Sequence, residues 1–201
     1  MGNHDFGKHG FGAEIFSAYF GFTKQAASSA PDNYSFQYGK AYFIVINSLD
    51  VSGQTQWLES ELQRAENNGF AFKIVMFHIP VYNPRRGRNN VDAQTHWVPL
   101  FDKYKVDLVL TGHDHSYLRS KRLKAGKPVA EGDFGTTYVV ATACNKFYQY
   151  ESLSLAEKQF TDIATYQVVT LDAMEDGANF LKFSAHDLSG RIMDKFETSN
   201  R

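Results

Sequence analysis

The sequence lacks the features that define several classes of protein. It has a single cysteine, Cys144, among 201 residues, which excludes an internal disulfide and a zinc site built on cysteines. Its net charge is −1, from 21 Lys and Arg against 22 Asp and Glu, and the cations are spread along the chain. Binding to a nucleic-acid backbone needs a clustered cationic face, so we expect no nucleic-acid partner.

Long apolar runs are also missing. No run approaches the roughly 20 residues that cross a bilayer, and no signal peptide opens the chain, so we expect no membrane partner and leave the compartment open. What is present is a globular composition, with 43% hydrophobic and 15% aromatic residues. Because no repeat, charge block or low-complexity linker interrupts the chain, we expect one domain over residues 1–201.

The first part of the chain alternates between helical and strand patterns. Apolar residues recur at helical spacing in two amphipathic segments, and two continuous apolar runs are typical of strands buried on both faces. In order, the pattern predicts a short helix Ala13–Phe20, a strand Ala41–Asn47, a helix over 55–69, a strand over 72–77, a helix Ala93–Tyr104 and a strand over 106–111.

After residue 115 the pattern changes to short strands separated by turn signals such as Ala125-Gly126 and Ser189-Gly190. The predicted strands are "SYLRSKRL", "TTYVVATAC", "TYQVVTLD", "NFLKFSAHD" and "RIMDKFE". The simplest assembly is therefore an α/β core with an antiparallel β extension.

Two of the buried strands end in histidine. The run "FKIVMF" leads into His78, and "VDLVLT" leads into Gly112-His113-Asp114-His115. In open α/β sheets, ligands collect at the carboxyl ends of the strands. In extended backbone, residues i and i+2 face the same way, so we expect His113 and His115 to reach one cavity while Asp114 points away. Hydrogen-bonded loop histidines are the alternative.

A third group of polar residues, Asn3-His4-Asp5, stands near the beginning of the chain. Asn and His are ligands that suit zinc, manganese or iron. The same triplet is also a common turn or helix cap, so taken alone it does not decide between the two.

Taken together and in this order, the motifs resemble a known family. "GNHD", a strand ending in His and a strand ending in "GHDH" are similar to the calcineurin-like metallophosphoesterase superfamily, and "HWVPLFDKYKVDLVLTGHDHSYLRS" resembles its purple-acid-phosphatase-like branch. The resemblance implies the C-terminal portion of a four-layer αββα sandwich with an antiparallel β tail. It implies hydrolysis of phosphate monoesters; a phosphodiesterase or nucleotidase on the same scaffold, or a non-catalytic metal- or phosphate-binding remnant, are the alternatives.

The resemblance also implies roles for single residues. Asn3, His78 and His113 match the ligands of one metal of a binuclear pair, and His115 matches a ligand of the other. The metals would be two of Fe, Zn or Mn, and they would activate a bound hydroxide to attack phosphorus. His4 matches the histidine that contacts the phosphoryl group and assists the leaving oxygen.

Asp5 and a basic loop are further candidates. Asp5 could orient His4 through a hydrogen bond, or could cap a turn. Arg85, Arg86 and Arg88 follow His78, and guanidinium groups suit the phosphate oxygens of a phosphorylated small molecule or phosphoprotein. A solvated surface loop is the alternative for these arginines.

Two motifs of the family have no counterpart here. An Asp-containing strand end and a Gly-Asp-x-x-Tyr segment precede GNHD in the family, whereas the Gly132-Asp133 of this chain comes after GHDH. We therefore expect the C-terminal part of a larger enzyme, which binds one metal or none tightly, is a poor catalyst and can self-associate through exposed core surface. Members of the branch are often exported.

Overall fold

The computed structural model describes residues 2–5, 18, 33–85, 87–143, 145–173 and 177–199. The helix expected over Ala13–Phe20 lies outside these residues, except for Ala18. The elements are β1 (Tyr34–Tyr38), β2 (Ala41–Val45), α2 (Val51–Asn67), β3 (Phe72–Met76), α3 (Val91–His96), α4 (Val98–Lys103), β4 (Leu108–Thr111), β5 (Tyr117–Ser120), β6 (Leu123–Lys124), β7 (Lys127–Pro128), β8 (Thr137–Val140), β9 (Ala156–Phe160), β10 (Thr165–Ala173), β11 (Asn179–Asp187) and β12 (Ile192–Ser199).

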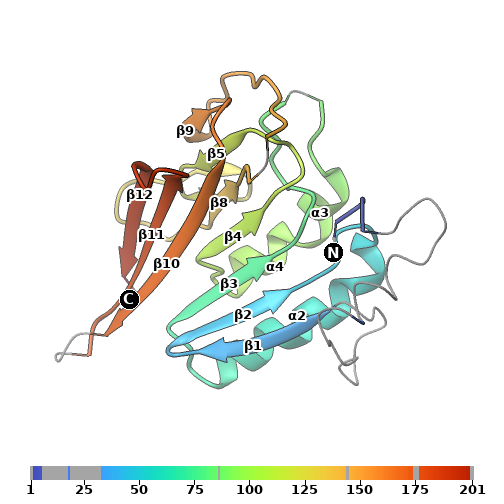
Figure 1. Cartoon of the computed structure of the whole chain (residues 1–201). Helices are drawn as coiled ribbons and strands as arrows, with labels where there is room; N and C mark the ends of the chain where they lie inside the picture. The colour runs from blue at the N-terminus through green and yellow to red at the C-terminus, as the bar shows by residue number, and fades with distance from the viewer. Residues whose placement is uncertain are drawn as a thin grey trace.

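These elements form three layers, which Figure 1 shows side by side. The central layer is a seven-stranded sheet in the order β1-β2-β3-β4-β8-β5-β9. Helices α2, α3 and α4 cover one face, and the antiparallel sheet β10-β11-β12 covers the other. The described residues thus supply an αββ arrangement, three of the four layers expected from the sequence.

The central sheet is parallel in its middle. Strands β2, β3, β4 and β8 run in the same direction, whereas β1, β5 and β9 pair antiparallel to their neighbours. The carboxyl ends of the four parallel strands therefore meet at one edge of the sheet, as α/β sheets with ligand sites require.

Helix α2 packs on the sheet through the stripe that the sequence predicts. Its inward residues Trp57, Leu58, Glu61, Leu62 and Ala65 are all buried. The helix begins four residues before the predicted start, because the Asp50 side chain accepts a hydrogen bond from Gly53 N and caps it. The buried Glu61 carboxylate is satisfied by the Tyr42 and Ser35 hydroxyls, each 2.6 Å away.

The single helix expected over Ala93–Tyr104 is in fact two. Helix α3 ends at His96 and α4 begins at Val98, with Trp97 between them. Pro99 lies in the first turn of α4, where its missing N–H is tolerated, but it cannot continue a helix that began at residue 91. The break leaves Trp97 fully buried, and its indole N–H donates to Val51 O.

Two hydrophobic clusters hold the layers together. One lies between the helices and the sheet and includes Trp97 and Phe101. The other joins the two sheets, with Phe72 and Ile74 of β3 against Phe183 of β11. No helix in the described part of the chain is long and apolar enough to cross a bilayer.

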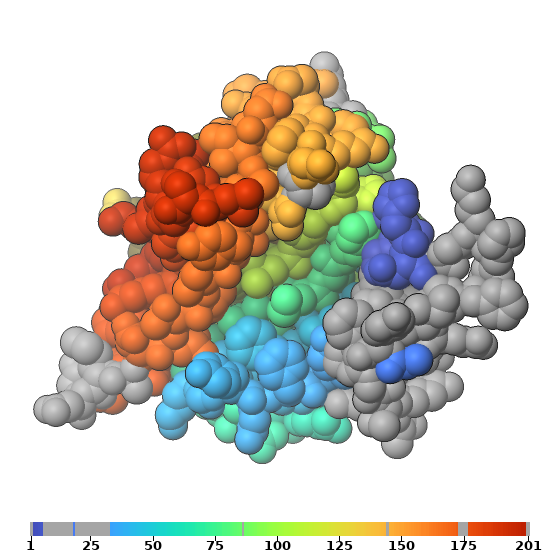
Figure 2. All heavy atoms as spheres, viewed as in Figure 1, coloured from blue at the N-terminus to red at the C-terminus, as the bar shows by residue number. Residues whose placement is uncertain are grey.

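A hollow remains between the two sheets near the carboxyl ends of the parallel strands. It has a volume of about 460 Å³ and is lined by residues that include Met76, Leu110 and Val169. Figure 2 shows residues 2–5, in dark blue, on the surface beside this hollow. The end of the sheet that carries the histidines is therefore open on this face.

Candidate metal centre

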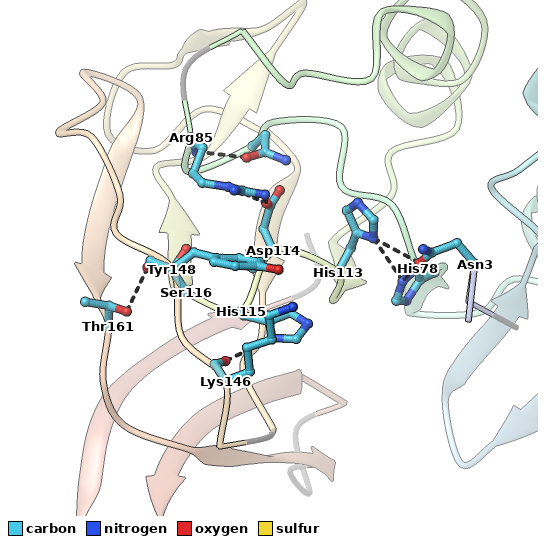
Figure 3. A network of polar contacts seen from close by, with 11 residues as sticks. Asn3, His78, Arg85, His113, Asp114, His115, Ser116, Lys146, Tyr148 and Thr161 are labelled. Carbon is cyan, nitrogen blue, oxygen red and sulfur yellow. Dashed lines mark hydrogen bonds and ion pairs between the residues drawn. The ribbon is translucent and has the colours of Figure 1, made fainter. Parts of the chain in front are cut away.

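Three side chains that can bind a metal converge at the carboxyl ends of β3 and β4. Asn3 Oδ1 lies 2.8 Å from His78 Nε2 and 3.2 Å from His113 Nδ1, and the two imidazole nitrogens are 3.1 Å apart. Figure 3 shows the three groups pointing toward one another. We call Asn3, His78 and His113 the donor trio.

Strand pairing brings the two histidines of the trio together. Met76 of β3 is in register with Leu110 of β4, and the pairing continues past the strand ends, where Phe77 N donates to Leu110 O and Gly112 N donates to His78 O. Since parallel strands end at the same edge of a sheet, the residues that follow them are neighbours. This is the arrangement expected from the two apolar runs that end in histidine.

The third donor comes from a tight turn at residues 2–5. The Asp5 carboxylate accepts a hydrogen bond from Gly2 N at 2.7 Å, and Asp5 N donates to Gly2 O at 3.0 Å. A Cβ atom on Gly2 would lie 2.9 Å from the His78 ring, so the absence of a side chain lets this turn approach His78 closely. The turn therefore places the Asn3 amide next to the two imidazoles.

The electrostatics of the trio favour neutral imidazoles. Burial, followed by the nearby charge of His113, lowers the pKa of His78 to about 4. Burial also lowers the pKa of His113, and the positive charges of Arg88 and Arg85 lower it further, although Asp114 opposes them. A neutral imidazole offers the lone pair that a metal ion needs.

The donor set fits one divalent cation. Two imidazole nitrogens and one amide oxygen within 3.2 Å of each other are acceptor atoms that a cation between them stabilises. No group of three or more His, Cys, Asp or Glu converges in the described ranges; the trio reaches three donors only because Asn3 contributes an amide. Three protein donors leave positions for water or substrate, as in catalytic zinc sites.

His113 and His115 line one cavity, as expected, but the extended backbone that the prediction assumed is absent. Strand β4 ends at Thr111, and both His113 and His115 adopt positive φ values, 71° and 52°. The backbone is therefore left-handed rather than extended at both residues, so the alternation of a strand does not apply. His115 Nδ1 instead lies 2.9 Å from Lys146 O, and its ring packs against Tyr148.

Asp114 points away from the trio, as expected, and holds Arg85. It is fully buried, and its Oδ1 accepts hydrogen bonds from Arg85 Nε at 2.8 Å and Arg85 Nη2 at 2.6 Å. The Arg85 guanidinium also lies over the Tyr148 ring, 4.2 Å from its centroid. Arg85, which the sequence suggested for substrate binding, is thus largely engaged within the protein.

The remaining predicted residues fall into three groups. His4 is exposed and borders the same cleft as His78 and His113, and the exposed Arg88 borders it too. Of the two roles suggested for Asp5, orienting His4 or capping a turn, the structure shows the second. Asp5 closes the turn of residues 2–5 through hydrogen bonds with Gly2. Arg86 lies outside the described residues.

The cleft itself has a volume of about 160 Å³. It contains two residues that no sequence pattern indicated, Lys146 and Tyr148, both from the loop after β8. The described residues that line it are His4, His78, Arg85, Arg88, His113, His115, Lys146 and Tyr148. His115 therefore shares the cleft with His78 and His113 of the trio, and none of these lining residues is acidic.

Comparisons with known proteins relate the chain to one family and one fold. The family model described as calcineurin-like phosphoesterase matches residues 1–117. A purple acid phosphatase of Glycine max is 36% identical over 107 residues, which are 50% of this chain and 23% of that protein. A protein of Arabidopsis thaliana named Fe(3+)-Zn(2+) purple acid phosphatase 12 is 34% identical over 106 residues, 50% of this chain and 23% of that protein.

A solved structure is similar over more of the chain. The purple acid phosphatase isolated from seeds of yellow lupin, Lupinus luteus, superposes with a TM-score of 0.69 at 20% identity, covering 85% of this chain and 33% of that one. At this identity the likeness shows the fold, which extends beyond the matched motifs into the β tail. The matches to the two curated relatives span about a quarter of the length of those proteins.

Proposed function

The chain belongs to the calcineurin-like phosphoesterase family, and on this premise we propose that it acts in the metal-dependent hydrolysis of phosphate monoesters. The observation that carries the proposal is the convergence of Asn3 Oδ1, His78 Nε2 and His113 Nδ1 within 3.2 Å of one another. Side chains from three distant segments meet here with nitrogen and oxygen donors that suit zinc, manganese or iron.

The trio would hold one such cation. When bound, the metal would polarise a phosphoryl oxygen and lower the pKa of its water. In the described residues three donors converge at one place, whereas His115 Nδ1 contacts Lys146 O and not these three donors. The proposal therefore includes a single tightly bound metal per chain and slow turnover of the chain by itself.

The other residues of the cleft act on the substrate in this proposal. His4 is exposed beside the trio and can donate a proton to the leaving oxygen of the ester. Arg88 presents a guanidinium at the cleft, where it can contact phosphoryl oxygens. The turn closed by Asp5 positions both Asn3 and His4, since it fixes the backbone on either side of them.

A second candidate is a non-catalytic module that binds a metal and phosphate. The three converging donors of the trio also favour this candidate, because one ion held by three neutral ligands can bind phosphate without hydrolysing an ester. A phosphodiesterase or nucleotidase would use the same metal and differ in the walls of the cleft, so model substrates separate these cases.

The test measures metal content and hydrolysis in the same preparations. The chain, incubated with zinc, manganese or iron and desalted, is assayed with p-nitrophenyl phosphate and with bis-p-nitrophenyl phosphate. We expect about one metal per chain, faster hydrolysis of the monoester, and loss of both metal and activity in His113→Ala. His186→Ala is the matched control, because His186 lies on β11 and does not border the cleft.

Each outcome discriminates between the candidates. Metal retention without hydrolysis favours the binding module, and faster cleavage of the diester favours a phosphodiesterase. Hydrolysis that survives His113→Ala would show that the trio is not the site.

A further inference from the structure

A second cavity lies at the opposite end of the central sheet from the donor trio. It forms where β3, β4 and β8 begin, and Lys73, Asp107 and Thr137 from these strand starts line it. Its volume is about 340 Å³, within the range of about 300 to 1,000 Å³ that is usual for small-molecule sites. Because the trio lies where β3 and β4 end, binding in this cavity needs neither the trio nor a metal.

The innermost charges of the cavity wall are paired within the protein. The Lys73 ammonium forms an ion pair with Glu66 at 2.6 Å, and its side chain is only 8% exposed. Lys73 N donates to Asp107 Oδ2 at 2.8 Å. An ammonium has three donors, and the described residues supply one partner for it, Glu66. Lys73 therefore keeps donors for a ligand in the cavity.

Two further cations line the cavity, Lys105 from the turn after α4 and Arg122 from the segment between β5 and β6. Neither side chain forms an ion pair or a hydrogen bond with another residue in the described part of the chain. Burial raises the pKa of Asp107 to about 7, so at pH 6 its carboxyl is largely neutral. At that pH the wall carries more positive than negative charge.

Another part of the wall is apolar. Phe70, Ala71 and Phe134 line the cavity, and all three are partly exposed to solvent. A flat apolar group placed against the two rings would remove apolar surface from water on both sides of the contact. The cavity therefore combines cationic groups with an aromatic wall.

We propose that this cavity binds a small carboxylate with an apolar body, such as an aromatic acid. Lys105 and Arg122 hold the carboxylate, since a guanidinium matches its two oxygens, and the free donors of Lys73 support it from the inside. The apolar body packs against Phe70 and Phe134. This binding goes beyond the proposed hydrolysis and does not rest on it.

The test locates the ligand and separates its two parts. Benzoate is titrated into the isotope-labelled chain at pH 6, after metal has been removed with a chelator, and the NMR shifts of the backbone amides are followed. We expect shifts at Gly69, Ala71 and Gly135, which border the cavity, and none at Gly112, which lies beside His78.

Two related probes test the charge and the ring. Benzamide has the same ring without the charge and should bind about three- to tenfold more weakly, the range expected for two partly solvated charge pairs. Acetate has the charge without the ring and should also bind more weakly than benzoate, because it buries less apolar surface.

Variants assign the charge preference to the two cations. Lys105→Gln and Arg122→Gln should each lower the preference for benzoate over benzamide by about two- to fivefold, and the double substitution should remove most of it. Lys158→Gln is the matched control, since Lys158 is exposed on β9 and does not border the cavity.

Three results would overturn the inference. They are equal affinity for benzoate and for either of the other probes, amide shifts that gather beside the trio instead of the cavity, and a preference that the double substitution leaves unchanged. The chain carries no metal in these titrations and no ester is present, so the outcome is independent of whether the proposed hydrolysis occurs.

Discussion

Asn3 and His113 are separated by 110 positions in the chain, yet Asn3 Oδ1 lies 3.2 Å from His113 Nδ1. Two unrelated features produce this contact. The parallel pairing of β3 with β4 places His113 next to His78, and the Asp5-closed turn at Gly2 places Asn3 against both rings. The site is therefore the meeting point of a sheet edge and one turn, and each can be tested separately.

Zinc should stabilise the folded chain through the trio. At a free zinc concentration 100 times the dissociation constant, the free energy of unfolding should rise by about 2.7 kcal/mol. His78→Ala should remove most of this gain, because it deletes one of three donors. His115→Ala should retain it, because the three donors that converge are those of Asn3, His78 and His113. Urea unfolding with and without zinc measures both, and the reverse order of effects would place the ion elsewhere.

Gly2→Ala should weaken zinc binding without loss of overall stability. The new Cβ would lie 2.9 Å from the His78 ring and would push the turn away from it. We expect about tenfold weaker binding, a loss typical of disturbed support around a metal ligand. Gly112→Ala is the matched control, since its Cβ would meet the same ring at 3.8 Å, an ordinary contact. Similar zinc affinity in the two variants would contradict the close-approach argument.

Asp114→Ala should destabilise the protein by about 3 kcal/mol, since it leaves the Arg85 guanidinium without its buried partner. The Asp114 side chain is fully buried, whereas that of Arg85 is 25% exposed. In the variant, water can therefore replace some of the hydrogen bonds that the guanidinium makes to Asp114. Chemical unfolding measures the change. Glu59→Ala, which breaks the exposed pair with Lys103, is the comparison and should cost clearly less. Equal losses would show that burial does not set the strength of the Asp114 pair.

Asp107 should make stability depend on pH. Burial raises the pKa of its carboxyl from 3.8 to about 7, although a hydrogen bond from Lys73 N opposes the rise. Between about pH 4 and pH 7 the folded chain then holds a proton that the unfolded chain has lost. The contribution of Asp107 is fully present below pH 4 and is lost as the pH rises through 7, with a slope of up to about 1.4 kcal/mol per pH unit.

The variant Asp107→Asn isolates this effect, because the amide keeps an oxygen that can accept from Lys73 N. The unfolding free energy of the unsubstituted chain, relative to that of the variant, should fall from pH 4 to pH 7. A relative stability that stays flat or rises over this interval would show that the Asp107 carboxyl is not protonated in the folded protein.

Local patterns predicted most of the elements. The stripe of α2 is buried residue by residue, and the strand expected over "NFLKFSAHD" is β11 with the same bounds. These predictions succeed because helical spacing and alternation report directly which side chains face a core. The expected single helix was wrong at Trp97 because the effect of Pro99 on backbone hydrogen bonding outweighs the periodicity.

The candidate site was predictable only where order along the chain matches order in the sheet. His78 and His113 follow neighbouring parallel strands, so the sequence indicates their proximity. His115 lines the same cavity as His113, as predicted, but the sequence did not indicate the left-handed backbone at residues 113 and 115 or the contact between His115 Nδ1 and Lys146 O. Lys146 and Tyr148 reach the cleft through a loop whose path depends on contacts with His115.

The sequence by itself determined the alternation of strands and helices, the family, and the residue types available to a metal, because these depend on local periodicity and on side-chain chemistry. Tertiary structure alone decided which of those residues share contacts: Asn3 with His78 and His113, Asp114 with Arg85, and His115 with Lys146. The reason is that hydrogen bonding and donor geometry act over about 3 Å, and only the packing of distant segments brings groups that close.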